Sequence, residues 1–543
     1  MLNVGERRAE AASHLVGTSD EVSASELKAK IRDGHELAIL DVRETGVFSQ
    51  GHLLYAISLP LSHLELRIGR LVPRMATRIV VCDNGEGLAQ QATARLRQLG
   101  YANVTLLKDG LSGWRKAEYE VFTGTNVYSK AFSEVLEHQL DTPRLSAAEL
   151  HKLLASNADV VVLDSRTEQE FRTSAIPGAH SCPGGELVHR VRSITASPKT
   201  TVVVNCAGRT RSIIGTQSLV NAGLANRVVA LQNGTMAWSL AGFELEKGRD
   251  SALPNPDPQA LAWSQAAAQR LAYATGIQRI DLKAIKAYRA DSSRTLYLID
   301  VRSELEYRQG HLPGSIWVPG GQLLQTLDEH VGTTNSRVVV IDSEQVRAPV
   351  VASWLSQMGW SRVFTFSLEG QQIEHEFGGG SIDARPIVEP FQTIDARELR
   401  EGLASGTHVV LDLDPSSSYR KGHIPGSWFV IRSRLPDLTQ KLAAKDEIAL
   451  TSKDSTLAHL AARELSALVS NPVRVLAGGT EAWKAAGYPL SAADTFWAHV
   501  PDDEWSPPET EQQMRDYLTW ELNLVDQIRR DGDARYRILK IAH

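Results

Sequence analysis

Cysteine is scarce in this sequence, since only Cys82, Cys182 and Cys206 occur among 543 residues. So few cysteines exclude a disulfide-stapled fold and agree with a reducing compartment, where thiols stay free. Long hydrophobic runs are also missing, because no stretch approaches the roughly 20 apolar residues of a membrane-spanning helix. The N-terminus lacks the continuous apolar core of a signal peptide. We therefore predict a cytoplasmic protein with no membrane partner.

The sequence also has no excess of positive charge. Its 58 Lys and Arg against 64 Asp and Glu give a formal net charge of −6, so no nucleic acid partner is predicted. No group of cysteines and histidines has the spacing of a metal site, and neither a metal nor an organic cofactor is predicted. The length exceeds what one hydrophobic core supports and predicts about three to five domains.

One pattern occurs four times along the chain. In each copy a short apolar run ends in a tripeptide that begins with aspartate, and a glycine-containing turn follows. The tripeptides begin at Asp41, Asp164, Asp300 and Asp412. A second apolar run, a loop and a helical pattern come next in each copy. Strands that alternate with helices predict a parallel sheet with helices on both faces, one in each repeat.

The second repeat carries the strongest functional signal, at residues 201–215. The run Val202-Val203-Val204 predicts a buried strand, and Cys206 follows at its carboxyl end, where open α/β sheets place their ligands. The next residues predict a tight loop with inward backbone N–H groups, and Ser212 is the predicted start of a helix. A buried strand-end cysteine is the structural alternative.

Three residues of this loop favour a reactive cysteine. Gly208 permits close backbone approach, and Arg209 and Arg211 bring two positive charges. Positive charge and N–H dipoles are typical of cysteines whose pKa falls from about 8.5 to roughly 3.5–7.5. We therefore predict that Cys206 is a thiolate nucleophile with a lowered pKa.

The loop from Cys206 to Ser212, CAGRTRS, resembles the active-site loop of the rhodanese sulfurtransferases, in which a cysteine carries a persulfide. Other segments with the same resemblance are Asp164–Arg166, Glu170-Phe171, Ile176–Ala179, Asn233-Gly234 and Trp238. The resemblance implies an α/β fold of four tandem rhodanese-like domains, each a parallel sheet flanked by helices. It implies that Cys206 is catalytic and that the loop binds substrate through Ala207, Gly208, Arg209, Thr210, Arg211 and Ser212.

The other three repeats lack a cysteine at the nucleophile position. Alignment of the strands places Asp83, Asp342 and Ser452 there, and only the third repeat keeps the closing arginine, as Arg347. Cys82 falls one residue early, on the other face of its strand, and is interpreted as a core cysteine. By analogy with paired domains in the family, repeats one and two are expected to pair, and repeats three and four to form a second, inactive pair.

Several other polar residues are interpreted as structural. His52, His311 and His423 recur in the turns, but the repeat with the nucleophile lacks the equivalent histidine. The Asp164 and Arg166 side chains are expected to form an ion pair, with Glu170 as a further partner. Cys182 is either incidental or a resolving thiol that approaches the pocket.

Boundaries follow from the repeats and the segments between them. Residues 126–141 and 254–272 carry helical patterns, and the tail contains a helix with Met514, Tyr517, Leu518, Val525 and Ile528 on one face, expected to dock on its own protein. The predicted segments are an N-terminal segment 1–22, a first domain 23–125, a linker 126–142, a second domain 143–249, a helical linker 250–275, a third domain 276–382, a fourth domain 390–492 and a helical tail 493–543.

The resemblance implies a thiosulfate sulfurtransferase that passes sulfur through a Cys206 persulfide. The small-molecule partners are a donor such as thiosulfate and an acceptor such as cyanide or a thiol; an acceptor protein and a homodimer are both compatible with the sequence. A cysteine phosphatase is disfavoured, because its C-x5-R loop is one residue longer than the C-x4-R loop closed by Arg211. A persulfide carrier or multidomain scaffold is the non-enzymatic alternative.

Overall fold

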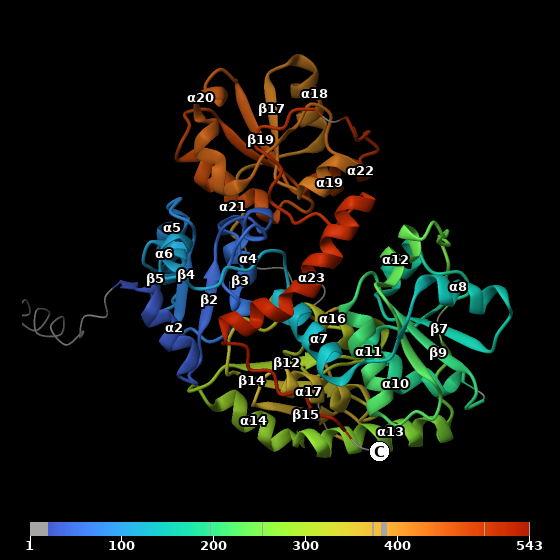
Figure 1. Ribbon diagram of the computed structural model, residues 1–543. Helices are drawn as coiled ribbons and strands as arrows, with labels where there is room; N and C mark the ends of the chain where they lie inside the picture. The colour runs from blue at the N-terminus through green and yellow to red at the C-terminus, as the bar shows by residue number, and fades with distance from the viewer. Residues whose placement is uncertain are drawn as a thin grey trace, which may run out of the picture.

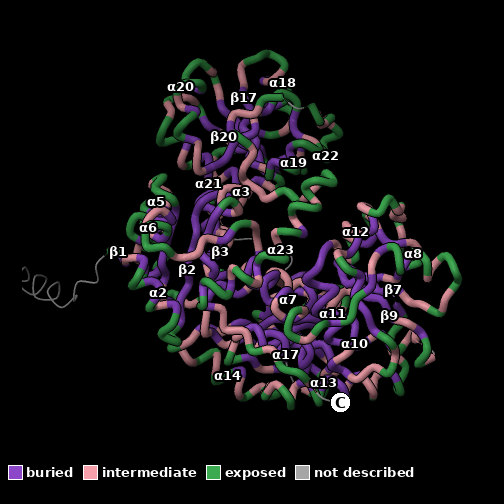
Figure 2. The backbone as a smooth tube through the Cα atoms, in the orientation of Figure 1, coloured by how far each residue is buried: buried purple, intermediate pink, exposed green. Residues whose placement is uncertain are grey.

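The computed structural model describes residues 20–195, 197–251, 253–371, 374–381, 388–493 and 495–541. The predicted N-terminal segment lies outside these residues up to residue 19. The four repeats form four α/β domains, each with a five-stranded parallel sheet, as predicted. Figure 1 shows the first domain in blue and the second in cyan and green, with the third below them and the fourth, in orange, above. The strands are the buried centre of each domain (Figure 2).

The first domain has the strand order β1-β5-β4-β2-β3. Its strands are β1 (Glu21–Val22), β2 (Ala38–Asp41), β3 (Ala56–Ser58), β4 (Ile79–Cys82) and β5 (Val104–Leu107). Its helices are α2 (Ala24–Arg32), α3 (Thr45–Phe48), η1 (Leu61–His63), α4 (Leu64–Leu71), α5 (Leu88–Gln98) and α6 (Gly110–Lys116).

The second domain has the equivalent order β6-β10-β9-β7-β8. Its strands are β6 (Arg144–Leu145), β7 (Val160–Asp164), β8 (His180–Ser181), β9 (Thr201–Asn205) and β10 (Val228–Leu231). Its helices are α8 (Ala147–Ala155), α9 (Glu168–Thr173), η2 (Gly184–Glu186), α10 (Leu187–Arg190), η3 (Val191–Ser193), α11 (Thr210–Asn221) and α12 (Gly234–Leu240).

The third domain repeats the order as β11-β15-β14-β12-β13. Its strands are β11 (Gln278–Arg279), β12 (Leu296–Asp300), β13 (Ile316–Trp317), β14 (Arg337–Asp342) and β15 (Val363–Ser367). Its helices are α14 (Leu282–Ala290), α15 (Glu304–Gln309), α16 (Gly320–Gln325), η4 (Leu327–Glu329) and α17 (Arg347–Gln357).

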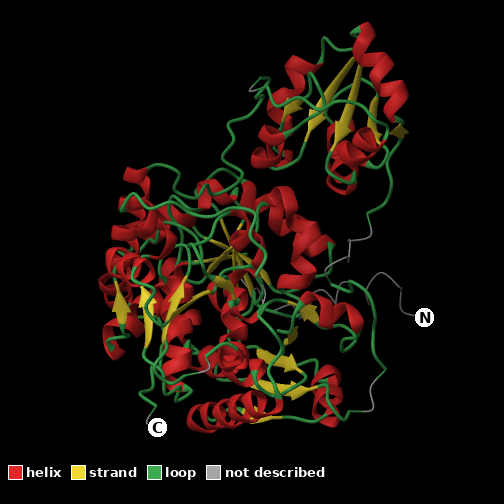
Figure 3. Ribbon diagram, turned by 90° about the vertical axis from the view of Figure 1, so that its right-hand side faces the viewer, coloured by secondary structure: helices red, strands yellow, loops and turns green. Residues whose placement is uncertain are grey.

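The fourth domain has the order β16-β20-β19-β17-β18 and projects from the body formed by the other three (Figure 3). Its strands are β16 (Thr393–Ile394), β17 (His408–Asp412), β18 (Trp428–Phe429), β19 (Glu447–Thr451) and β20 (Val473–Leu476). Its helices are α18 (Ala396–Ser405), α19 (Ser416–Lys421), η5 (Arg432–Leu438), α20 (Thr439–Leu442), α21 (Thr456–Ser466) and α22 (Gly479–Ala485).

Three helices lie outside the domains, and the sequence predicted each of them. Both linkers are helical, as α7 (Val127–Leu140) and α13 (Pro258–Thr275), and the tail contains α23 (Glu511–Asp531). In Figure 1, α23 runs through the middle of the molecule beside α7. It docks on its own chain, as expected, and buries Leu518, Leu524 and Ile528. Among the helices of the described ranges, none combines the length and the apolar character needed to cross a membrane.

A buried ion pair closes the first turn of three domains. Arg43 bonds Asp41 at 2.5 Å, while Arg166 bonds Asp164 and Arg302 bonds Asp300 at 2.7 Å each. These pairs confirm the structural interpretation of the aspartate tripeptides. The fourth domain has Asp414 in place of the arginine, and burial together with the Asp414 carboxylate raises the pKa of Asp412.

The domains do not pair in sequence order, so the expected pairing of one with two and three with four is wrong. Domains two and three share one continuous hydrophobic core with α7, α13 and α23. Gly184 and Gly185 face Gly320 and Gly321 at this interface, and a Cβ atom on Gly185 would lie 3.0 Å from the Gly320 Cα. Such backbone contact leaves no room for side chains, which explains a glycine pair in both domains.

The first domain contacts the third, for example through the Thr295 hydroxyl, which donates to Glu36 at 2.9 Å, and it also contacts the fourth. Arg432 of the fourth domain bonds Glu65 of the first domain at 2.8 and 2.9 Å, and also Glu464 of its own domain at 2.6 Å. Glu44 accepts hydrogen bonds from Ser62 at 2.6 Å and from Ser433 at 2.9 Å. The analogy failed because a sequence repeat specifies the fold of each domain, whereas pairing depends on the residues at each domain surface.

Candidate active site

Cys206 lies where the sequence placed it, directly after the central strand β9. The loop leads into α11, which begins at Thr210, two residues earlier than the predicted start at Ser212. The Thr210 hydroxyl accepts a hydrogen bond from Ser133 of α7 at 3.2 Å. Because α11 begins here, the backbone N–H groups of its first turn point toward the residues that precede the helix. Anions bind to such groups at helix N-termini.

The thiol is more enclosed than predicted. Cys206 is 2% exposed, and its Sγ lies 3.4 Å from the Ser212 Oγ. Burial raises the pKa of the thiol, and the lowering effects of Arg211 and Ser212 do not offset it. The predicted fall in pKa is therefore wrong for this closed arrangement. Local residues do favour the thiolate, but removal of water from around the sulfur has the larger effect.

A close approach between two loops fixes the position of the cysteine. Thr235 and Met236, at the start of α12, donate backbone hydrogen bonds to the carbonyls of Cys206 and Ala207 at 2.8 and 3.0 Å. Gly234 has a φ of +55°, and a Cβ atom there would lie 2.2 Å from the Cys206 carbonyl oxygen. Only glycine fits at this position, which is the physical reason for the Asn233-Gly234 sequence.

Arg209 points to the linker helix α7. It bonds Glu134 through two nitrogens at 2.7 Å each, contacts Glu137, and donates to the Asn233 side chain at 2.9 Å. These two carboxylates neutralise its charge within the protein. That Arg209 binds the sulfur donor stays a prediction, and its pairing with Glu134 and Glu137 argues against this role.

Arg211 closes the loop and also makes a strong internal pair. It bonds both Glu170 oxygens at 2.7 Å and the Gln322 side chain of the third domain at 2.9 Å. Although burial acts in the opposite direction, Arg211 and Thr167 lower the pKa of Glu170 to about 2. Glu170 was expected to be a further partner of the Asp164–Arg166 ion pair. Instead it pairs with Arg211 at the end of the loop that follows Cys206.

The C-terminal helix α23 covers the loop at Gly208. A Cβ atom on Gly208 would lie 3.4 Å from a Glu521 oxygen, 3.7 Å from Tyr517 and 3.9 Å from Leu518. These are ordinary contact distances, so the glycine is not required by backbone crowding. Tyr517 donates to one Glu521 oxygen at 3.0 Å, and the other oxygen has no hydrogen-bond partner among the described residues. Burial raises the pKa of Glu521 to about 7.

Exchange of Glu521 for glutamine is expected to speed alkylation of Cys206 by iodoacetamide. The carboxylate contributes to the raised pKa of the thiol, so its removal at pH 8 should increase the rate roughly three- to tenfold. Below a pH of about 7 Glu521 is mostly protonated, and the two rates should converge. Intact mass against time measures both rates. Glu511→Gln, on the exposed end of the same helix, is the matched control, and equal rates at pH 8 would contradict the prediction.

A cavity of about 520 Å³ opens beside the loop. Ala207 and Arg211 contribute to its wall from the second domain. Glu170 and Met236 also come from the second domain, and the rest of the wall comes from outside it and includes Arg67, Lys130, Asp328, Trp505 and Tyr517. The first domain, the third domain, the linker helix and the tail thus all shape the space next to Cys206. Sequence patterns of the second domain alone contain no signal for these residues.

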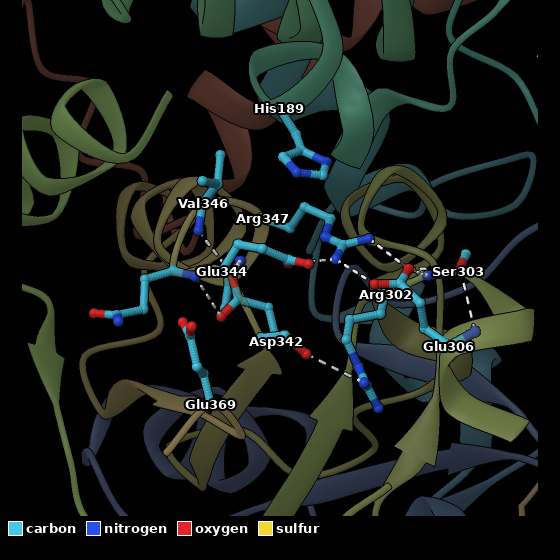
Figure 4. Close-up of polar contacts among 12 residues, drawn as sticks. His189, Arg302, Ser303, Glu306, Asp342, Glu344, Val346, Arg347 and Glu369 are labelled. Carbon is cyan, nitrogen blue, oxygen red and sulfur yellow. Dashed lines mark hydrogen bonds and ion pairs between the residues drawn. The ribbon is translucent and has the colours of Figure 1, made fainter. Parts of the chain in front are cut away.

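The other three domains have Asp342, Asp83 and Ser452 at the position equivalent to Cys206. In the third domain the Asp342 carboxylate accepts backbone hydrogen bonds from Gln345 and Ala348 at 3.2 and 3.1 Å. It accepts a third from Val346 at 2.8 Å (Figure 4). Asp83 accepts from two N–H groups of its own loop at 2.9 and 3.0 Å, and the Ser452 hydroxyl accepts one at 3.2 Å. These side chains occupy the N–H donors that would otherwise bind an anion.

The other cysteines and the turn histidines are structural. Cys82 and Cys182 are buried in hydrophobic cores, and burial raises the pKa of both thiols. Cys82 is thus a core cysteine, as interpreted, and the enclosure of Cys182 argues against a resolving role. The rings of His311 and His423 stack on Tyr307 and Tyr419, and all three turn histidines hydrogen-bond to carbonyl oxygens at 2.8 Å.

Comparison with known proteins also finds four repeated domains along the chain. The sequence model of the rhodanese-like domain family matches residues 23–117, 146–241, 282–370 and 395–486. The crystal structure of a thiosulfate sulfurtransferase from Pseudomonas aeruginosa is similar with 42% identity and a TM-score of 0.93, over 96% of this chain and 100% of that one. A sulfurtransferase from Allochromatium vinosum is 26% identical over 97 residues, 18% of this chain and 89% of the relative. The chain therefore belongs to the rhodanese-like domain family, as a tandem array of four such domains.

Proposed function

We propose that this protein transfers the outer sulfur of thiosulfate to a small thiophilic acceptor through a persulfide on Cys206. The observation that carries the proposal is the placement of one cysteine at the carboxyl end of a central strand and before a helix N-terminus, in one domain out of four. The chain is a rhodanese-type transferase. The Pseudomonas aeruginosa protein, similar over nearly the whole length, supports thiosulfate as the donor.

The first half-reaction forms the persulfide. The Cys206 thiol loses its proton to solvent, and the thiolate attacks the outer sulfur of thiosulfate. A sulfur–sulfur bond to Cys206 forms while the bond inside thiosulfate breaks, and sulfite leaves with the electron pair. The N-terminus of α11 and the Arg211 guanidinium stabilise the negative charge on the outer sulfur that remains.

The second half-reaction regenerates the thiolate. Cyanide attacks the outer persulfide sulfur, a carbon–sulfur bond forms, and the electron pair of the broken sulfur–sulfur bond returns to Cys206. A low-molecular-weight thiol reacts in the same way and leaves as a persulfide. Because Cys206 is 2% exposed and α23 covers its loop, small acceptors are favoured over an acceptor protein.

Incubation with thiosulfate is expected to add one sulfur, about 32 Da, to the intact mass, with one equivalent of sulfite released. The Cys206→Ala variant should show neither change, because the other two thiols, Cys82 and Cys182, are packed into hydrophobic cores away from this loop. Mass gain without turnover to cyanide or thiols would instead favour a persulfide carrier. Absence of mass gain and sulfite in the wild type would exclude thiosulfate as the donor.

A further inference from the structure

The buried ammonium of Lys130 lies beside the nucleophile loop. Lys130 is on the linker helix α7, one turn before Glu134, and is 3% exposed. It lines the same cavity as Ala207 and Arg211. A charged group from outside the second domain therefore reaches the cavity that Ala207, the residue next to Cys206, helps to line.

Three aromatic rings of the C-terminal segment surround this ammonium. Its nitrogen lies 5.3 Å from the centres of the Trp505 and Tyr517 rings and 5.1 Å from that of Trp520. Ring faces attract a cation, but they do not satisfy the three N–H donors of an ammonium. In the described ranges no hydrogen bond or ion pair joins the Lys130 nitrogen to another residue. Such a buried, unsatisfied cation indicates a site for an anion.

The other cations near the loop are already neutralised. Arg209 is paired with Glu134 and Glu137, and Arg211 is paired with Glu170. The remaining basic residue of the cavity wall is Arg67 of α4, for which no ion pair occurs within the described residues. Lys130 and Arg67 are thus the cations of this wall that are free to bind a ligand.

The carboxylates of the same wall make hydrogen bonds to other groups, although burial, which lowers the pKa of Lys130, is opposed by the charges of Asp328 and Glu329. Glu170 holds Arg211, and the Asn126 amide donates to Asp328 at 3.1 Å and to Glu329 at 2.9 Å. Glu504 accepts a backbone hydrogen bond from Ser417 at 3.1 Å. Glu521 lies behind Gly208, outside the cavity wall, and its charge also acts on Lys130. The Lys130 ammonium can therefore be approached by an anion from the cavity side.

We propose that Lys130, assisted by Arg67, binds the anionic head of the sulfur donor, which for thiosulfate is its sulfonate group, while the outer sulfur meets Cys206. This inference rests on the proposed sulfur transfer. It assigns a task to the tail and to the first domain, since the aromatic cage and Arg67 complete a site that the second domain lacks. Sulfite carries more negative charge on these oxygens than bound thiosulfate does, so the same ammonium also stabilises the leaving group.

Two alkylating agents of the same chemistry but different charge test the site without sulfur transfer. The ratio of the Cys206 alkylation rate by iodoacetate to that by iodoacetamide reports how strongly the cavity attracts an anion. Lys130→Met should lower this ratio about tenfold and raise the KM for thiosulfate at least about tenfold. Lys130→Arg keeps the charge and should stay within a factor of about three of wild type in both measurements.

Lys28 offers a matched control. It is also a buried lysine that docks α23, with its nitrogen 5.4 and 5.1 Å from the rings of Trp114 and Tyr119, but it is paired with Asp531 and Asp533. Lys28→Met should leave the iodoacetate ratio unchanged. An equal fall in both variants would reassign the effect to docking of the tail and overturn the inference.

The two proposals fail in different ways. If the wild type releases no sulfite from thiosulfate, the proposed donor is wrong, but the alkylation ratio still tests the anion site. If sulfite release is normal and neither the ratio nor the KM changes in a folded Lys130→Met variant, Lys130 is not the anion-binding residue. Lys130→Gln, with a polar side chain of similar length, gives the same test where the methionine variant does not fold.

Discussion

Cys206→Ser is expected to lower sulfur transfer from thiosulfate to cyanide at least about a thousandfold. A serine hydroxyl occupies nearly the same space, so the fold and the cavity should be retained. It does not ionise near neutral pH and forms no persulfide, because the sulfur that must carry the transferred atom is missing. The colorimetric rate of thiocyanate formation measures the loss.

Two variants test whether the other cysteines contribute to turnover. Cys82→Ala and Cys182→Ala remove cysteines that lie within hydrophobic cores. Both should keep turnover within about twofold of wild type, since core truncations of this size affect stability and not the loop. Cys206→Ser could instead keep more than about a tenth of the wild-type turnover and lose it when Cys182 is also removed. That result would show that Cys182, and not Cys206, carries the sulfur.

Arg347→Met is expected to have the largest effect on stability. Arg347 is fully buried between the second and third domains and pairs with Glu186 at 3.0 Å. It also pairs with Glu306 at 2.7 Å and with Glu344 at 2.6 Å (Figure 4). Its removal leaves Glu306 and Glu344 without an ion-pair partner among the described residues of this poorly hydrated interface, while Glu186 keeps its pair with Arg190 at 2.8 Å. The free energy of unfolding should fall by about 3–5 kcal/mol, and the thermal midpoint of this part of the molecule by roughly 10 °C.

The effect should depend on pH with a defined sign. Against the opposing effect of burial, Arg347 lowers the pKa of Glu306 to about 2 and also lowers that of Glu186. The stabilisation is therefore complete above the ordinary glutamate pKa of 4.5 and is lost as the pH falls toward 2. The midpoint difference between wild type and Arg347→Met should be largest at pH 7 and shrink below pH 4.

A surface ion pair provides the control for this experiment. Arg463 bonds Glu389 at 2.9 Å, with side chains that are 53% and 81% exposed. Arg463→Met should change the midpoint by no more than about 2 °C, because exposed pairs contribute little. A midpoint change for Arg347→Met as small as this one would show that solvent already screens the buried cluster.

The position of Arg347 in its repeat does not predict the contacts that it makes. From sequence, Arg347 matches the loop-closing Arg211 and looks like a remnant of a catalytic loop. In the structure each of these arginines reaches across the interface, Arg211 to Gln322 and Arg347 to Glu186. The two arginines occupy equivalent positions in domains two and three, and each contacts the other domain. Arg347 therefore contributes to the interface between these domains.

Sequence alone determined the features that depend on near neighbours. Four apolar runs that end in aspartate predicted four parallel sheets, and the valines before Cys206 predicted the strand that presents it. The helical linkers and the tail helix followed from periodicity in the same way. Each of these features arises from hydrogen bonds and burial within a short stretch, which a local pattern records.

Tertiary structure decided which domains meet and what surrounds the thiol. Domains two and three pair through facing glycines, Lys130 and Glu134 come from a linker, and Glu521 comes from the distant tail. Burial then reversed the predicted direction of the Cys206 pKa. Charge, solvent access and domain contacts depend on groups far apart in the chain, so the sequence located Cys206 at the end of its strand, while only the folded array supplied its electrostatic surroundings.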